Sequence, residues 1–214
     1  MKQRKGVFIT LEGGEGSGKT TVHKGIEEHL SLKNKVFSTR EPGGSKIAEQ
    51  IRHVILNQDN TEMDEFTEAL LYVAARSQHL KEKVIPQLDE GKIVLCDRYL
   101  DSSLAYQGHA RGIGIDKVLE VNKFAVEDYM PDLTIYLDLS PEVGMSRINK
   151  DSNRELNRLD LEKMEFHKKV REGYLIVAKM FPKRIVVINA DRTPEEILNH
   201  INQIIDEFLN KRNP

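Results

Sequence analysis

A chain of 214 residues with a formal net charge of −2 has room for one domain with a full hydrophobic core, and it lacks the clustered basic charge of a nucleic-acid-binding face. Charged residues make up 31% of the chain and are mixed in sign, so we expect a small anionic ligand held by a few local cations. The single cysteine, Cys96, excludes an internal disulfide and is expected to be a buried structural thiol. No apolar stretch approaches the roughly 18 residues that span a bilayer, which predicts a cytoplasmic protein without a membrane partner.

Apolar and amphipathic runs alternate along the chain, a pattern typical of a parallel sheet with helices on both faces. The expected strands are residues 7–11, 36–38, 93–96, 133–139 and 185–188. Expected helices include 20–32, a long one at 65–88, and a C-terminal helix that begins at Thr193-Pro194-Glu195-Glu196 and presents one face made of Ile197, Ile201, Ile204 and Phe208. Because no repeat or low-complexity linker interrupts this order, residues 1–214 are predicted to form a single domain.

A glycine-rich stretch near the N-terminus carries the first motif with a defined chemistry. Residues 13–20 fit the phosphate-binding pattern G-x-x-x-x-G-K-[ST], between an expected strand and an expected helix. In such a loop the backbone N–H groups surround an anion, Lys19 reaches the β- and γ-phosphates, and the Thr20 hydroxyl ligates Mg²⁺. The predicted contacts to the donor nucleotide are Gly13, Gly14, Glu15, Gly16, Ser17, Gly18, Lys19, Thr20 and Thr21.

A phosphate loop alone permits ATPases, GTPases, transporter motors and nucleotide kinases. A GTPase needs an Asn-Lys-x-Asp element, and the nearest match, Asn149-Lys150-Asp151, lacks the intervening residue and does not follow a strand. A motor or helicase would normally be larger or more basic. Phosphoryl transfer to a small molecule is therefore the leading class.

The segment at about 147–160 is polar and rich in charge, and it lies between two helical runs. It is either a solvated connection or a lid that brings Arg154 or Arg158 over a phosphate during closure. The phosphate loop elsewhere in the chain favours the lid.

A second site is predicted where the apolar run 93–96 ends. Asp97 follows this run, so its carboxylate reaches the carboxyl edge of the sheet, where ligands bind in open α/β folds. There it can hold Mg²⁺ through water, while Arg98 contacts an acceptor phosphate or the transferring group. The alternative is a strand-end aspartate with a structural arginine partner.

The blocks around this site resemble bacterial thymidylate kinases. Asp97-Arg98-Tyr99 and the run Ser-Leu-Ala-Tyr-Gln-Gly at 103–108 match that family's most specific motifs. Residues 39–44 (Thr-Arg-Glu-Pro-Gly-Gly) resemble its second-strand motif, and residues 67–76 resemble its acceptor-site helix. The resemblance extends from about residue 7 to the C-terminal helix. It implies the P-loop NTPase fold, with a five-stranded parallel sheet and a lid.

The resemblance also implies a reaction: ATP, with Mg²⁺, donates its γ-phosphoryl group to dTMP, giving dTDP and ADP in dTTP synthesis. It further implies a homodimer. The metal would lie between Thr20 and Asp97, and the implied catalytic residues are Lys19, Arg40, Arg98, Arg154 and Arg158. The implied dTMP contacts are Glu15, Glu41, Arg52, Tyr72, Arg76, Arg98, Ser102, Ser103, Tyr106 and Gln107.

Several of these implied roles are specific. By analogy with the family, Tyr72 stacks on thymine, Arg76 meets the base edge, and Tyr106 crowds a ribose 2′-OH. Glu15 matches an acidic position that meets the deoxyribose 3′-OH or a magnesium-bound water. Because the loop itself contains no second basic residue, the resemblance points to the bacterial type, in which lid arginines supply that charge, with Arg147 a weaker candidate.

Two other interpretations remain open from sequence. One is a kinase for another nucleoside monophosphate or a deoxynucleoside. The other is a nucleotide-binding switch or regulatory ATPase that has no acceptor. An acceptor phosphate gives Arg40, Arg76 and Arg98 a role, whereas a switch has no use for them.

Overall fold

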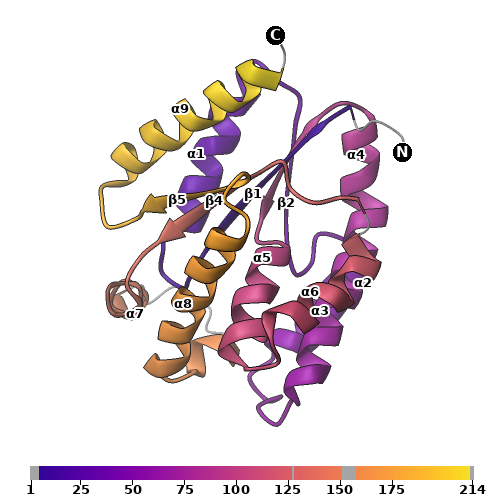
Figure 1. Ribbon diagram of the computed structural model, residues 1–214, viewed down its shortest axis with the longest axis vertical. Coiled ribbons are helices and arrows are strands. Elements are labelled where there is room, and N and C mark those ends of the chain that lie inside the picture. The colour runs from indigo at the N-terminus through magenta and orange to yellow at the C-terminus, as the bar shows by residue number, and fades with distance from the viewer. Residues whose placement is uncertain (1–4, 127, 151–157, 213–214) are drawn as a thin grey trace.

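The computed structural model describes residues 5–126, 128–150 and 158–212 and contains one five-stranded parallel sheet of order β2-β3-β1-β4-β5 (Figure 1). The strands are β1 (Val7–Gly13), β2 (Val36–Arg40), β3 (Ile93–Asp97), β4 (Leu133–Asp138) and β5 (Ile185–Asn189). All five predicted strands are therefore confirmed. Four of them run a residue or two beyond the predicted ends, because the ladder continues past the apolar run into polar residues such as Arg40 and Asp97, which pair in register.

Helices cover both faces of the sheet, as predicted. Helices α1 (Lys19–Ser31) and α9 (Pro194–Arg212) bury Val22, Ile26 and Ile201 against one face (Figure 1). The opposite face carries the remaining core, which includes Phe8 and the buried thiol of Cys96. The elements on that side include α3 (Glu65–His79), α4 (Ile85–Asp89), α5 (Leu100–Ser103), α6 (Ile115–Val126) and α8 (Met164–Met180). None of the helices in the described ranges is long and apolar enough to cross a membrane.

The prediction of one regular helix over 65–88 needs correction. The chain stays helical there, but α3 passes into a π-helical turn, η1 (Leu80–Val84), before α4 begins. Pro86 lies at the start of α4, where its missing N–H is tolerated, and the wider π turn precedes it. The start of α3 is fixed by Asp64, whose side chain accepts hydrogen bonds from the amides of Phe66 and Thr67.

The C-terminal helix begins as its sequence predicts. The Thr193 hydroxyl accepts from the Glu196 amide, and the Glu196 carboxylate accepts from the Thr193 amide, which is a reciprocal cap. Its most buried side chains are Ile197, Ile201 and Ile205; of the predicted face, Ile204 and Phe208 are partly buried against the same core. A spacing of four residues keeps all three isoleucines on one stripe.

The carboxyl ends of the strands form one edge of the sheet, and the strand order switches at β1, with β2 and β3 on one side of it and β4 and β5 on the other. Strand β1 lies between β3 and β4, with Leu11 opposite both Asp97 and Ile135. Ligands of open α/β sheets bind at such a switch point. Helix α2 (Lys46–Leu56), the π-helical segment η2 (Leu104–Ala110), α7 (Pro141–Lys150) and the 3₁₀ turn η3 (Arg158–Leu161) gather near this edge.

Candidate active site

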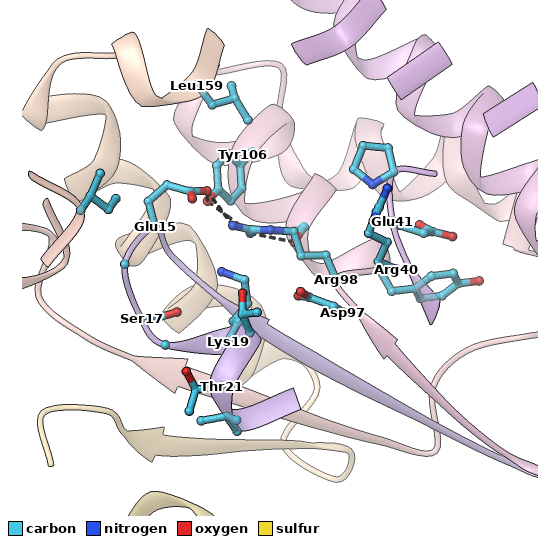
Figure 2. Close-up of a pocket in the computed structure, with 18 of the residues that line it drawn as sticks. Glu15, Ser17, Lys19, Thr21, Arg40, Glu41, Asp97, Arg98, Tyr106 and Leu159 are labelled. Carbon is cyan, nitrogen blue, oxygen red and sulfur yellow. Dashed lines mark hydrogen bonds and ion pairs between the residues drawn. The ribbon is translucent and has the colours of Figure 1, made fainter. Parts of the chain in front are cut away.

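One cavity of about 680 Å³ lies over this edge of the sheet and joins the phosphate loop to a wall built from α3 and η2 (Figure 2). Its donor-side lining includes all the loop residues from Glu15 to Thr21. Its other side includes Tyr72, Arg76 and Gln107. The two predicted sites, far apart in sequence, therefore share one space.

The loop conformation depends on glycine at two positions. Gly16 and Gly18 have φ values of 69° and 87°, in the left-handed region that other residues rarely adopt. A Cβ on Gly16 would lie 2.2 Å from the carbonyl oxygen of Gly144, so the loop and α7 approach each other through bare backbone. The Ser17 hydroxyl donates to the Gly14 carbonyl at 2.8 Å and stabilises the turn into α1. The amides at the start of α1 are thus available to an anion.

Lys19 lies at the centre of the loop. Its ammonium donates to the carbonyls of Gly13 and Gly14, each at 3.0 Å. Burial lowers the pKa of Lys19 to about 8, and the neighbouring Arg98 acts in the same direction. A buried cation at the start of helix α1 is suited to binding phosphate oxygens. The negative charge of a bound phosphate would raise the pKa of Lys19 again.

Asp97 and Thr20 both line the cavity, as predicted for a metal site. Among the described residues, the Asp97 Oδ1 atom is buried and has no hydrogen-bond partner. In the same ranges no three His, Cys, Asp or Glu side chains gather to hold a metal alone. Magnesium commonly takes one or two protein oxygens and completes its shell with phosphates and water, so this pair fits Mg²⁺ bound with a nucleotide.

Arg98 follows β3 and extends into the cavity, and hydrogen bonds fix both its backbone and its guanidinium. Its φ of 65° is unusual for a non-glycine residue, and its amide donates to the Leu11 carbonyl at 2.9 Å. One terminal nitrogen donates to the Glu15 carboxylate at 2.6 Å, and the other to the Tyr106 hydroxyl at 3.3 Å (Figure 2). The second nitrogen also donates to the Tyr174 hydroxyl, at 3.1 Å. The Tyr106 hydroxyl also donates to Glu15, at 3.1 Å.

Two further arginines flank the same region. Arg40, at the end of β2, is half-exposed and pairs with the Glu49 carboxylate at 3.0 Å. Arg52 donates to the Pro42 carbonyl at 2.9 Å, and burial and the positive charge of Arg40 lower its pKa. Both line the cavity. With Arg98 they surround a space suited to an acceptor phosphate.

The wall opposite the loop is organised around Arg76. Its guanidinium donates to the Glu41 carboxylate at 2.8 Å, the Tyr99 carbonyl at 3.0 Å and the Ser103 hydroxyl at 3.1 Å, and also to the Asn122 side chain. Only 2% of Arg76 is exposed, yet it still reaches the cavity. Four positions earlier on α3, Tyr72 also lines it, so the two side chains share one face as predicted.

Ser103 and Glu41 lie differently from the ligand contacts expected of them. Ser103 is not among the lining residues in the part of the chain that the structure describes, and its hydroxyl supports Arg76 from behind. Glu41 lines the cavity, but its two carboxylate oxygens accept from Arg76 and from His79, at 2.8 and 3.0 Å. His79 in turn contacts the Thr39 hydroxyl at 2.7 Å. These groups orient Arg76 for a ligand.

Glu12 is the residue that the sequence analysis missed most completely. It is buried at the end of β1, where its carboxylate accepts from the Tyr99 amide at 2.8 Å, the Ser102 hydroxyl at 2.6 Å and the Tyr174 hydroxyl at 3.0 Å. Burial and the nearby Asp101 raise its pKa to about 7. Its position just before the glycine run was the available signal, since a glutamate is unusual in an apolar strand.

The lid prediction is only partly covered by the structure. Arg154 lies outside the described residues. Arg158, the other candidate for a phosphate contact on closure, donates to the Ile55 carbonyl at 2.9 Å and pairs with the buried Glu68 carboxylate. Its guanidinium is 5% exposed and held by these partners. Arg147, the weaker candidate, does line the cavity.

The remaining lining residues come from elements that no motif marked. Arg192, Pro194 and Ile197 lie near the donor side, and Arg147 contacts the Ala190 carbonyl there. Leu56 and Leu159 supply apolar surface from α2 and η3. An apolar residue or an isolated arginine in these segments has no local signature, so only the assembled fold identifies it as part of the cavity.

Comparison with known proteins agrees with this geometry. The sequence profile of the family described as Thymidylate kinase matches residues 11–201. Curated relatives named thymidylate kinase include one from Clostridium novyi, 62% identical over 92% of this chain and 97% of its own length, and one from Bacillus cereus, 58% identical over 96% and 99%. A solved structure of thymidylate kinase from Ehrlichia chaffeensis aligns with a TM-score of 0.76, at 32% identity, over 94% of this chain and 98% of that one. This chain therefore belongs to the thymidylate kinase family.

Proposed function

We propose that this chain transfers the γ-phosphoryl group of ATP to dTMP, giving dTDP and ADP. The observation that carries the proposal is the single cavity that joins a phosphate loop to the Tyr72–Arg76 face of α3. Family membership supports the same reaction. A nucleotide switch would need the loop but not the second wall, and the arginines gathered there would have no ligand.

On the donor side, the chain's own groups provide charge and position. The loop amides and Lys19 would bind the β- and γ-phosphates, and the loss of phosphate solvation would be offset by these fixed donors. Thr20 and Asp97 would hold Mg²⁺, which when bound neutralises charge between the phosphates. Phosphoryl transfer needs little covalent help from a protein, so alignment and charge neutralisation are the main contributions.

On the acceptor side, Arg98 and Arg52 would bind the dTMP phosphate, with Arg40 at the mouth of the site. Tyr72 would stack on the thymine ring, and Arg76 would donate to the base edge from its buried network. Gln107 and Ser102 would complete the polar contacts. Tyr106, beneath the sugar, would disfavour a ribose 2′-OH, while Glu15 would accept from the 3′-OH.

A coupled assay of ADP release tests the reaction. Purified protein with Mg-ATP is given dTMP, dUMP, UMP, CMP or AMP, and phosphorylated product is identified by chromatography. We expect the highest kcat/KM for dTMP. Turnover that prefers AMP or CMP would assign another nucleoside monophosphate, and ATP hydrolysis that no acceptor stimulates would favour the switch.

We also propose that the enzyme is a cytoplasmic homodimer of single-domain subunits, the dimer being what the family resemblance implies. Three neighbouring helices, α2, α3 and α6, expose large apolar side chains, of which Phe124 is 87% and Phe66 59% exposed. Others on the same helices are Ile47, Val54, Leu70 and Val121. Such a patch marks an interface. Sedimentation should give twice the subunit mass, and Phe124→Glu should shift it toward the monomer.

A further inference from the structure

Glu68 is a buried carboxylate to which neither the phosphate loop nor the predicted acceptor contacts assign a role. It lies on α3 one turn before Tyr72 and two turns before Arg76, so the three side chains share a stripe. Its side chain is 1% exposed. A buried carboxylate is unfavourable unless it is paired, so its partners indicate why it is there.

Those partners are Gln107 in η2, Arg111 directly after η2, and Arg158 in η3. The Glu68 Oε1 atom accepts from the Gln107 amide at 2.8 Å and from Arg111 Nε at 3.3 Å. The Oε2 atom accepts from Arg111 Nη2 at 3.2 Å and from Arg158. Burial by itself would raise the pKa of Glu68, but Arg111, Gln107 and Arg158 together lower it, which keeps the group ionised.

Two of these partners, Gln107 and Arg158, belong to the cavity wall or adjoin it. Gln107 itself lines the cavity. Arg158 donates its Nε to the carbonyl of Ile55, in the last turn of α2, where a helix leaves carbonyls without intrahelical donors. The residues next to these two contacts, Leu56 and Leu159, are the apolar lining of α2 and η3. Figure 2 places Leu159 above Tyr106 on the acceptor side.

Arg111, which directly follows η2, is the third partner of Glu68. It bridges Glu68 to Glu162, at 2.6 Å from the latter, and its guanidinium lies 4.4 Å from the centre of the Phe166 ring. Two arginines and two carboxylates thus neutralise one another in a mostly buried cluster. The cluster joins α3, η2, and the chain that leads from η3 into α8.

We propose that Glu68 is a positioning residue for the acceptor pocket, holding Gln107 on one side and, through Arg158, the Leu56 and Leu159 surfaces on the other. Acceptor binding then depends on one buried charge that does not itself touch the nucleotide. The inference rests on the proposed function, because it concerns the same pocket. It assigns Arg158 to the shape of the acceptor site and not to charge neutralisation at the donor phosphates.

The test is steady-state kinetics of Glu68→Gln, with dTMP and ATP varied separately. Glutamine preserves size and one hydrogen bond to Gln107 but removes the charge that holds two arginines. We expect KM for dTMP to rise roughly tenfold or more, with KM for ATP and kcat within about twofold, because bonds to charged groups are the strong ones. The matched control is Glu65→Gln, the same change at an exposed position on α3, which should behave as wild type.

A second variant keeps the inference testable if Glu68→Gln does not fold. Arg158→Gln leaves Glu68 paired with Arg111 and Gln107, so we expect a smaller rise in KM for dTMP and an unchanged kcat. In the double variant the two effects should not add. A large fall in kcat for Arg158→Gln, or an unchanged KM for dTMP in folded variants of both residues, would overturn the inference. Failure of wild type to phosphorylate dTMP would instead reject the proposed function.

Discussion

The two sides of the cavity present different kinds of group to a ligand: mainly backbone on the donor side and buried side chains on the acceptor side. On the donor side, residues 13–20 form a contiguous loop whose phosphate-binding groups are mostly backbone amides at the start of α1. On the acceptor side, Arg76 and Glu68 are buried side chains whose partners lie up to 90 residues away in the sequence. A backbone site needs only the correct local conformation, whereas a side-chain site needs several elements packed at once. We therefore expect the donor site to tolerate substitutions in the surrounding elements, and substitutions at the acceptor site to change both substrate binding and the free energy of unfolding.

The largest effect expected from this contrast is at Lys19. Lys19→Ala should lower kcat by on the order of 10²-fold or more, because a charge aimed at the transferring phosphates is lost. The melting temperature should change little, since this side chain bonds only to loop carbonyls in the contacts that the structure describes. Lys24→Ala, an exposed lysine on the same helix, is the control. Wild-type turnover in Lys19→Ala would contradict the assignment of the donor-phosphate site to this loop.

Arg76→Lys should show the opposite combination on the acceptor side. Lysine keeps the charge but cannot reproduce the forked contacts to Glu41, Tyr99 and Ser103, so we expect the free energy of unfolding to fall by about 1–3 kcal/mol. KM for dTMP should rise roughly tenfold or more. Urea denaturation and kinetics on one preparation measure both.

The control for this change is Arg212→Lys, the same substitution at a more exposed ion pair near the C-terminus. It should alter stability by no more than about 0.5 kcal/mol. If both variants were equally stable and equally active, the buried fork would not be what distinguishes the acceptor side.

Substrate choice sharpens the comparison, because only the acceptor side should discriminate. A ribose 2′-OH against the buried Tyr106 would lose its water without gaining a partner, so kcat/KM for UMP should fall about tenfold relative to dUMP. The missing methyl of dUMP should cost about 1 kcal/mol relative to dTMP. Purine monophosphates should be excluded by size. KM for ATP should be the same with each acceptor, and a ranking with UMP above dTMP would contradict the pocket assignment.

The smallest expected effect is a pH dependence of stability at Glu12, which lies beneath both sides. Its pKa rises from an ordinary value of 4.5 to about 7 in the fold, so the folded state binds this proton more tightly than the unfolded chain does. The associated stability is complete below about pH 4.5 and is lost as the pH rises through 7.

Melting temperatures of wild type and Glu12→Gln between pH 5 and pH 8 test this assignment. The advantage of wild type over the variant should shrink by a few degrees across the range. Glu28→Gln, at an exposed position on α1, should run parallel to wild type. Parallel curves for Glu12→Gln as well would show that Glu12 is ionised throughout.

The degree to which sequence anticipated each part follows from how local it is. The strand and helix on either side of the phosphate loop, the alternation of strands and helices along the chain, and the cap of α9 depend on neighbours within a few residues, and they were predicted correctly. The π turn at Leu80–Val84 was missed, because helical periodicity continues through it. The pairing of Arg158 with Glu68 was not predicted, because a basic residue in a polar segment carries no sign of the carboxylate that pairs with it.

By itself, then, the sequence determined the class of chemistry: alternating periodicities specify a parallel sheet, and a glycine-rich loop between strand and helix specifies a phosphate site. Motif resemblance added the acceptor. Only the tertiary structure decided which side chains face the ligand and which stand behind them, as Ser103 stands behind Arg76 and Glu68 behind Gln107. The physical reason is that a buried charge must find its partners wherever the fold brings them, and those distances are set by packing and not by spacing along the chain.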